Sequence, residues 1–510
     1  MELMLAVFAG LGGLELWLWW PPLWQRRKFP ATVLVFPQLL VSLAIFLKEP
    51  GLWAFVLVFL SAYRTINLLR IIKARMQADY LYRISRRAAW QLIGLQALDA
   101  ALAGLAGHFR IGIVAWLYLV TAAQLAAGAI LFTTTLKQLR NTKPPQPGTA
   151  HADKDLPSLT VAIPARNETT DLEDCLQSLL TSTYPKLEIL VLDDCSQNSR
   201  TPEIIRSFAH QGVRFVAGKT PPGQWLAKNY AYAQLAEEAN GELLLFCGVD
   251  VRFRPDSLRR LVEILLYKKK GMLSLIPGNE LPDRRDLASN LVQPARYAWE
   301  LALPRRLLGR PPVLSTCWLI SREVLQKAGG FAAVSRKAIP EAYLARQAAA
   351  IQNGYIFLQS DNNIGIGSHK SFDEQLATAT RTRYPQLHRR LELVALTGLA
   401  EFSVLLWPLA ILITGLLSRL WWLAALSGLG YCMEVITYSK VVNLTYRKKS
   451  IRGILLLPVA ALYDIAILNY SMWRYEFREV IWKGRNVCIP VMRRIPEPQP
   501  APRPRQAAGD

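Results

Sequence analysis

Three short segments of this 510-residue chain place carboxylate side chains directly after an apolar run. The segments are Val161-Ala-Ile-Pro-Ala-Arg-Asn-Glu168, Leu190-Val-Leu-Asp-Asp-Cys-Ser196 and Phe246-Cys-Gly-Val-Asp-Val251. Carboxylates can accept hydrogen bonds from a nucleotide base and from a ribose. A carboxylate can also hold a divalent cation that bridges a diphosphate. Carboxylates in three such segments can therefore serve a ligand that combines a base, a ribose and a diphosphate.

The apolar runs in these segments belong to an alternation of strands and helices. The expected strands lie at 159–163, 187–192, 213–216 and 243–247, and the expected helices lie at 169–182, 201–210 and 224–239. Such an alternation predicts a mostly parallel, doubly wound sheet. Ligands of these sheets bind at the carboxyl ends of the strands. The polar segments fall at these ends, as a shared site requires.

The composition indicates a membrane protein. Hydrophobic residues make up 52% of the chain, and it has 15 Trp, a residue that favours the membrane–water boundary. The net charge of +22 then fits anionic lipid headgroups better than nucleic acid, for which no binding motif is present. Six cysteines without paired spacing predict reduced thiols in a cytosolic compartment.

Apolar runs close to the length that crosses a membrane lie on both sides of the strand–helix segment. The runs before it are 3–24, 31–47, 51–69, 89–107 and 111–136, and those after it are 391–417, 419–438 and 453–472. They predict four or five transmembrane helices at the N-terminal side. At the C-terminal side they predict two or three transmembrane or interfacial helices.

The domain boundaries follow from these runs. They are 1–140 for the N-terminal membrane domain, 141–157 for a linker, 158–388 for the catalytic domain, 389–475 for the C-terminal membrane domain and 476–510 for a basic, Pro-rich tail. Basic residues gather in alternate loops, which predicts a multi-pass protein with its catalytic domain in the cytosol. We expect a bacterial plasma membrane.

The order and spacing of the polar segments resemble the glycosyltransferases of family 2, inverting enzymes of the GT-A fold that use nucleotide-diphosphate sugars. The membrane flanks are similar to the lipid-glycosylating branch that includes ceramide glucosyltransferase and hopanoid- and carotenoid-associated enzymes. The resemblance covers about 157–388, with a weaker likeness in Ile481-Trp-Lys-Gly-Arg485. It implies an α/β GT-A domain inserted between two transmembrane helix bundles, with an inverting, hexosyltransferase-like activity.

The resemblance also assigns residues to the donor site. Those of the nucleotide pocket would be Pro164, Ala165, Asn167, Glu168, Asp193 and Asp194. Glu168 would lie near the ribose, and one of the two aspartates would accept a hydrogen bond from the base. Asp250 matches the last acid of the family's DxD motif and would bind Mg²⁺ or Mn²⁺ against the diphosphate. Gly248 replaces the first acid, which weakens the metal assignment and leaves a catalytically inactive relative as an alternative.

Two further residues are candidates for contact with the donor and the acceptor. Lys228 follows a Gly-rich turn, where it can reach a diphosphate or a sugar, or can remain a solvated lysine on a capped helix. The family's general base lies about ten residues after a Gly-Gly-Phe turn, and Glu341 follows Gly329-Gly-Phe331 at that distance. The alternative for Glu341 is a carboxylate that stabilises a helix N-terminus. Asp361 and Asp373 are the substitutes for the base.

The segment Thr380-Arg-Thr-Arg-Tyr384 occupies the place of the family's QxxRW element. Arg383 and Tyr384 fit its Arg–aromatic pair, and an arginine fork suits a diphosphate. The alternative is a basic collar for lipid headgroups. His369 and Lys370, just before this segment, are candidates for contact with the acceptor.

We therefore predict an inverting transferase that glycosylates a membrane lipid from a nucleotide-diphosphate sugar. One alternative is a processive polysaccharide synthase, against which the degraded QxxRW element argues. The other is an inactive relative that binds nucleotide-sugar or lipid as an assembly subunit.

Overall fold

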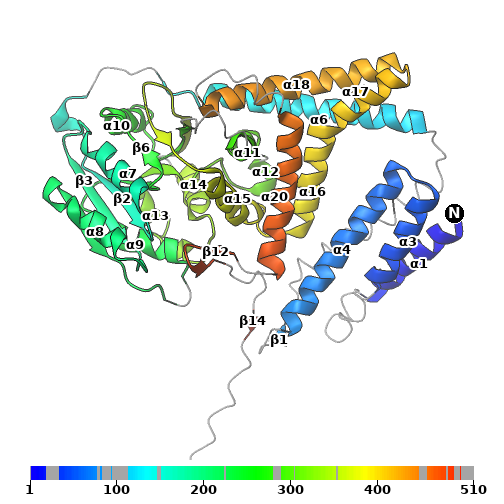
Figure 1. Cartoon of the computed structure of the whole chain (residues 1–510), viewed down its shortest axis with the longest axis horizontal. Helices are drawn as coiled ribbons and strands as arrows, with labels where there is room; N and C mark the ends of the chain where they lie inside the picture. Colours follow the sequence, from blue (N-terminus) through cyan, green and yellow to red (C-terminus); the bar gives the residue numbers. More distant parts are fainter. Residues whose placement is uncertain are drawn as a thin grey trace, which may run out of the picture.

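The computed structural model joins an α/β domain to a set of long helices, which lie beside it in Figure 1. It describes residues 2–18, 34–76, 81–82, 94, 101, 113–145, 151–222, 225–279, 289–303, 305–351, 354–446, 456–477, 480–487 and 494–495.

A seven-stranded sheet forms the centre of the α/β domain. Its strands, in spatial order, are β10 (Tyr355–Gln359), β7 (Met272–Ile276), β9 (Cys317–Ser321), β5 (Leu243–Cys247), β2 (Leu159–Ala165), β3 (Leu187–Asp193) and β4 (Val213–Ala217). Only β9 among them runs antiparallel to its neighbours. Ala165 pairs with Asp193, so β2 and β3 end at the same edge. The mostly parallel sheet that the sequence predicts is confirmed.

Helices cover both faces of this sheet. They are α7 (Thr170–Leu180), α8 (Arg200–Ser207), α9 (Ala227–Glu238), α10 (Ser257–Tyr267), α13 (Arg322–Lys327) and α14 (Pro340–Ala350). In β2, Ile163 packs into the core with Leu176, whereas Ala162 packs into the opposite core with Leu235. All four side chains are fully buried. Burial of a leucine of this kind contributes about 1.5–3 kcal/mol, so the two cores hold the strand ends at fixed positions.

Two small β elements lie near the carboxyl edge of the sheet. The strands β6 (Val251–Arg252), β11 (Gly367–Ser368) and β8 (Gly278–Asn279) form a three-stranded sheet beside it. The strands β12 (Ile481–Trp482) and β13 (Arg485–Asn486) form a hairpin. The remaining short strands, β1 (Leu81–Tyr82) and β14 (Arg494–Ile495), pair with each other.

The remaining helices come from both ends of the chain and from segments between or after the strands of the sheet. They are α1 (Glu2–Leu18), α3 (Val35–Lys48), α4 (Leu52–Met76), α6 (Ile113–Asn141), α11 (Ser289–Ala302), α12 (Arg305–Leu308), α15 (Phe372–Gln386), α16 (Leu391–Glu401), η5 (Phe402–Leu406), α17 (Trp407–Leu417), α18 (Trp421–Tyr446) and α20 (Leu457–Phe477). α6 and α18 run side by side along one edge of the molecule, although they lie far apart in the sequence (Figure 1).

Within the described residues, two helices are long and apolar enough to cross a membrane. They span Leu117–Asn141 and Leu393–Leu417, and three shorter apolar helices accompany them. This is fewer than the sequence predicts. α18 and α20 fall short because polar side chains such as Glu434 and Asp464 interrupt their apolar runs. The predicted run 89–107 lies almost entirely outside the described residues.

Candidate active site

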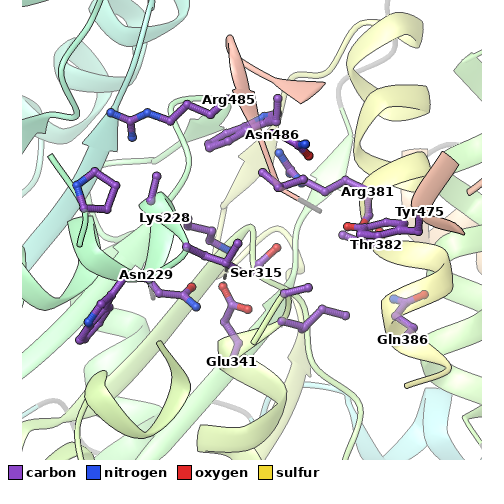
Figure 2. Close-up of a pocket in the computed structure, with 18 of the residues that line it drawn as sticks. Lys228, Asn229, Ser315, Glu341, Arg381, Thr382, Gln386, Tyr475, Arg485 and Asn486 are labelled. Carbon is purple, nitrogen blue, oxygen red and sulfur yellow. Dashed lines mark hydrogen bonds and ion pairs between the residues drawn. The ribbon is translucent and has the colours of Figure 1, made fainter. Parts of the chain in front are cut away.

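A cavity of about 300 Å³ lies between α9, α11, α14, α15 and the hairpin β12–β13. Its polar lining includes Lys228, Asn229, Arg296, Ser315, Glu341, Arg381, Thr382, Gln386, Tyr475, Trp482, Arg485 and Asn486. Figure 2 labels most of these side chains and shows the labelled ones converging from elements that are distant in sequence. The α9 and α14 residues lie below the hairpin, and the α15 residues lie to one side.

Glu341 and Lys228 form an ion pair inside this cavity. Glu341 is fully buried in the first turn of α14, and its Oε1 accepts a hydrogen bond of 2.5 Å from Lys228 Nζ. Burial lowers the pKa of Lys228, and the Glu341 carboxylate opposes that shift. The other oxygen, Oε2, has no hydrogen-bond partner among the described residues. Glu341 therefore has one oxygen that is fixed by Lys228 and one that can take a proton from a ligand.

Two arginines in the cavity form no ion pair with a carboxylate of the described residues. Arg296 is buried, and its Nε and Nη1 have no hydrogen-bond partner within the described part of the chain. The Arg381 guanidinium lies 4.5 Å from the centre of the Trp482 ring and forms no ion pair with any described residue. Burial lowers the pKa of Arg381 to about 10, so it remains charged at pH 7. Desolvated cations need a partner, and an anionic ligand such as a diphosphate would supply it.

The hairpin lies across the edge where the sequence places the nucleotide. Arg485 Nη1 donates to both carboxylate oxygens of Asp194, at 2.7 and 2.6 Å. Lys483 forms an ion pair with Glu168. Arg166 Nε donates to the Lys483 carbonyl at 2.8 Å, and its Nη1 donates to the Asp194 carbonyl at 2.6 Å. Burial raises the pKa of Asp194 and of Glu168, against the pull of these cations. Both predicted nucleotide contacts are thus engaged by the hairpin.

The other predicted nucleotide residues tie two loops together. Asn167 has a positive φ of 50°, and its Oδ1 accepts a hydrogen bond from the backbone N–H of Gln197 at 2.8 Å. Asp193 Oδ1 accepts from the backbone N–H of Ser196 at 3.2 Å. Pro164 and Ala165 are the last two residues of β2. None of these four predicted residues lines the cavity.

Asp250 lies beside the small sheet, close to the turn that contains Gly248. Its Oδ2 accepts a hydrogen bond of 2.6 Å from Ser368 Oγ, and Lys370 Nζ lies 3.5 Å from the same oxygen. No group of three or more His, Cys, Asp and Glu in the described residues is arranged to hold a metal ion. Mg²⁺ is often bound by one or two carboxylates together with substrate phosphates, and Asp250 fits that smaller donor set.

Arg383 and Tyr384 face away from the cavity. Arg383 forms ion pairs with Glu401, at 3.0 Å, and with Asp464. Tyr384 is fully buried, and its hydroxyl lies 2.8 Å from Glu476 Oε1. Both residues therefore join α15 to α16 and α20. The contact of Arg383 and Tyr384 with the donor stays a prediction. Their partners in α16 and α20 do not favour it.

The sequence interpretation missed the contribution of Arg296, and it did not assign Arg381 or Arg485 to the donor. Arg381 precedes the predicted Arg383 by two residues, which turns it to another face of α15. The signal for Arg485 was the Ile481–Arg485 motif, whose partner Asp194 lies 291 residues away. No local pattern indicates Arg296.

Comparison with known proteins finds glycosyltransferases that are similar to the α/β domain. Residues 160–329 match the family model for glycosyl transferase family 2. The chain is 28% identical over 163 residues to a 4,4'-diaponeurosporenoate glycosyltransferase of Staphylococcus aureus, which covers 32% of this chain and 40% of the relative. It is 33% identical over 99 residues to glycosyltransferase AglE of Haloferax volcanii, which covers 19% of this chain and 31% of the relative. The chain thus spans less than half of each of these two relatives.

Solved structures of glycosyltransferases are also similar to the chain. One is the mannosyltransferase PcManGT of Pyrobaculum calidifontis in complex with GDP-Man and Mn²⁺, with 17% identity, a TM-score of 0.42, and coverage of 70% of this chain and 98% of that structure. Another is glucosyl-3-phosphoglycerate synthase of Mycobacterium tuberculosis, with 20% identity, a TM-score of 0.32, and coverage of 46% and 81%.

Proposed function

We propose that this chain, whose residues 160–329 match the family model for glycosyl transferase family 2, transfers a sugar from a nucleotide-diphosphate sugar to a lipid acceptor at a membrane surface. One observation carries the proposal. Glu341, with one carboxylate oxygen held by Lys228, shares a cavity with Arg296, Arg381 and Arg485. The cavity thus combines a base with cations suited to a diphosphate.

The proposed reaction is a single displacement with inversion. The acceptor hydroxyl attacks the anomeric carbon of the sugar, and the bond from that carbon to the diphosphate oxygen breaks. Glu341 Oε2 takes the hydroxyl proton, and the electron pair leaves with the nucleotide diphosphate. Arg296 and Arg381 would stabilise the negative charge that develops there.

The divalent cation of this proposal would be Mg²⁺ or Mn²⁺. Asp250 would hold it together with oxygens of the donor diphosphate. When bound, the ion would neutralise charge on the leaving group. Lys370, which lies 3.5 Å from Asp250, would add positive charge on the same side.

The order of the helices supports the proposal of a lipid acceptor. α15, which supplies Arg381, is followed directly by the apolar helix at Leu393–Leu417. An acceptor in the adjacent membrane leaflet would reach the cavity over a short path. We place this face in the cytosol, in a multi-pass protein, because the basic loops predict that orientation.

In the experiment, membranes that contain the full chain are incubated with a panel of radiolabelled nucleotide-sugars. The label that enters the organic extract is then measured. One donor is expected to label a lipid, and Glu341→Gln is expected to lower the rate by about 10²–10⁴-fold, the usual contribution of a general base. Chelation of divalent cations should also remove the label.

Asp373→Asn is the matched control, because Asp373 is exposed, lies outside the cavity and was a substitute candidate for the base. It should leave the rate unchanged. If no donor labels any lipid, or if Glu341→Gln keeps the wild-type rate, the proposal is wrong.

A further inference from the structure

Three side-chain oxygens of the residues that line the cavity have no hydrogen-bond partner within the described part of the chain. They are Asn229 Oδ1, Glu341 Oε2 and Gln386 Oε1. All three side chains are buried: Glu341 is fully covered, and Asn229 and Gln386 are 1% and 5% exposed. A buried acceptor is unfavourable unless a donor reaches it. A ligand that fills this cavity and displaces water therefore has to bring hydrogen-bond donors.

The amide of Asn229 can turn only its oxygen toward a ligand. Its Nδ2 donates to three backbone carbonyls, those of Val334 at 2.7 Å, Ser335 at 3.1 Å and Lys337 at 2.9 Å. A carbonyl has no proton to donate, so the nitrogen must face these atoms and the oxygen must face away from them. The same contacts fix the start of α9 to the segment that leads to Glu341. Asn229 Oδ1 is therefore an acceptor of fixed orientation.

The amide of Gln386 is oriented in the same way. Its Nε2 donates to Glu300 Oε1 at 3.1 Å, which leaves Oε1 on the other side of the amide. Gln386 is the last residue of α15, and the apolar helix Leu393–Leu417 begins seven residues later. Figure 2 shows Asn229 and Gln386 on opposite sides of Glu341. The proposed base thus stands between two neutral acceptors.

A single hydroxyl cannot satisfy three acceptors. The reacting hydroxyl of the acceptor gives its one proton to Glu341 Oε2. A long-chain alcohol that carried only this hydroxyl would displace water from the oxygens of Asn229 and Gln386 and leave both unpaired. A carboxylate would bring only further acceptors. Additional hydroxyls on the same headgroup would pair with both amide oxygens.

We propose that the lipid acceptor carries a polyhydroxylated headgroup, a sugar or another polyol, which Asn229 and Gln386 hold on either side of Glu341. The inference rests on the proposed function and deepens it, because it names the chemical class of the acceptor. Asn229 and Gln386 are the residues that determine this specificity. Each accepts one hydrogen bond from a hydroxyl that does not react.

The experiment measures binding to the full chain, without transfer, in a zwitterionic detergent that has no hydroxyl group. Octyl β-glucoside and 1-octanol share a tail and differ in the headgroup, whereas methyl β-glucoside has the headgroup without the tail. Octyl glucoside should bind at least about tenfold more tightly than either, because only it combines the tail with the further hydroxyls. Equal binding of octanol would overturn the polyol headgroup. Equal binding of methyl glucoside would overturn its attachment to a lipid.

Gln386→Met tests the site directly, because it removes the acceptor and keeps the length of the side chain. Glu300 retains its contacts with Arg310 and with the backbone N–H of Val313. The variant should bind octyl glucoside about three- to tenfold more weakly and octanol as wild type does. Gln326→Met, the same change at an exposed position outside the cavity, is the control and should bind both like wild type. An unchanged ratio of the two affinities in Gln386→Met would overturn the proposal, whatever its melting temperature.

The sugar of the donor is the other source of hydroxyls, and competition separates the two sources. The octyl glucoside titration is repeated with UDP-glucose and GDP-mannose and with UDP and GDP. None of the four should weaken the binding of octyl glucoside. If the nucleotide-sugars compete and the nucleotide diphosphates do not, the two amide oxygens serve the donor sugar and the proposal is wrong. Because no transfer is measured, a chain that binds octyl glucoside in this way and labels no lipid would contradict the proposed function alone.

Discussion

The Asp250 carboxylate occupies the space that a side chain at position 248 would need. A Cβ atom at position 248 would lie 2.4 Å from Oδ1 of Asp250, closer than non-bonded atoms approach. Ser368 and Lys370 hold the other oxygen of Asp250 from the opposite side. The glycine thus allows the Asp250 carboxylate to lie over the turn. The loop therefore packs with one acid in this motif, Asp250, and a glycine in place of the other.

We expect Gly248→Ala to lower the transfer rate about tenfold with little loss of stability, because Asp250 must turn away from its position. Gly248→Asp, which restores the family's pattern, should lower it as well. The measurement is the initial rate of lipid labelling, together with the thermal unfolding midpoint. Gly398→Ala, whose added Cβ meets no atom within 4 Å, is the control and should keep the wild-type rate. A faster Gly248→Asp enzyme would contradict this account of the loop.

Single residues of the site were predictable when a local pattern marked them. Glu341 follows a Gly-Gly-Phe turn and Lys228 follows a Gly-rich turn, so each was found separately. Their 2.5 Å contact was not predicted, because 113 residues separate them and only the folded sheet brings α9 to α14. Arg383 was chosen over Arg381 because a motif gives a position in sequence but not the direction of a side chain around a helix.

At the scale of elements, the hairpin β12–β13 forms part of the wall of the cavity. Trp482 stacks under Arg381 from one strand, and Arg485 reaches Asp194 from the other. Gly484 has a φ of +77°, which its place in the turn requires. A segment that follows the last long helix therefore completes a site built on the first strands of the sheet.

Arg485→Ala is expected to raise the KM for the nucleotide-sugar about 10- to 100-fold, since the hairpin loses its charge-assisted contact with Asp194, a predicted nucleotide contact. The KM for the lipid should change little. Initial rates over a range of each substrate separate the two effects. Arg419→Ala, an arginine in the turn between α17 and α18 that does not line the cavity, is the control. A lower KM for the donor would show instead that the hairpin blocks the site.

The pairing of β3 with its neighbours includes a carboxylate whose ionisation can be tested. Glu188 accepts hydrogen bonds from Thr160 Oγ1 at 2.6 Å and from Asn240 Nδ2 at 2.7 Å, and it pairs with Arg214 at 3.0 Å. Burial would raise its pKa, but the hydrogen bonds from Asn240 and Thr160 and the charge of Arg214 outweigh burial and lower it.

Glu188→Gln should lower stability by about 1 kcal/mol at pH 7, a shift of a few degrees in the melting temperature. The pKa of Glu188 is lower in the folded protein than in the unfolded chain. At pH values just below the ordinary pKa of a glutamate, the unfolded chain therefore binds more protons than the folded protein. The stabilisation by Glu188 is thus complete above the ordinary pKa, and it is lost as the pH falls through the lowered pKa of the folded state. Thermal unfolding from pH 7 to pH 3.5 should show the two proteins converging. A difference that stays constant over this range would contradict the assignment.

The alternation of strands and helices was readable because each element has its own period of apolar residues. The strand predicted at 243–247 is β5 with the same bounds, and the other three predicted strands begin where the structure begins them. The antiparallel direction of β9 was not predictable, since a buried strand reads the same in either direction. The hairpin was equally hidden, because its strands are two residues long and are held by ion pairs to distant loops.

At the scale of the whole molecule, buried polar contacts join the α/β domain to the long helices. Gln359 at the end of β10 donates from Nε2 to the Leu139 carbonyl of α6 at 2.9 Å. On another side, Arg383 of α15 pairs with Glu401 of α16 and with Asp464 of α20. The side chain of Arg383 is 3% exposed and lies 4.7 Å from the Trp299 ring. This one cation therefore holds α15 and two apolar helices together.

Arg383→Met should destabilise the protein by about 3–5 kcal/mol, because it leaves two buried carboxylates without their cation. The triple variant Arg383→Met/Glu401→Gln/Asp464→Asn, which removes all three charges, should recover much of that loss. Arg381→Met should do the reverse. It should keep the wild-type melting temperature in detergent and weaken donor binding, since Arg381 lines the cavity and pairs with no carboxylate in the described part of the chain. Thermal unfolding and donor titration on the same preparations separate the two roles. If Arg383→Met melted like wild type and lost only donor binding, the diphosphate contact would belong to Arg383, as the sequence motif predicts. The three-helix junction would then contribute little to holding the catalytic domain against the helices.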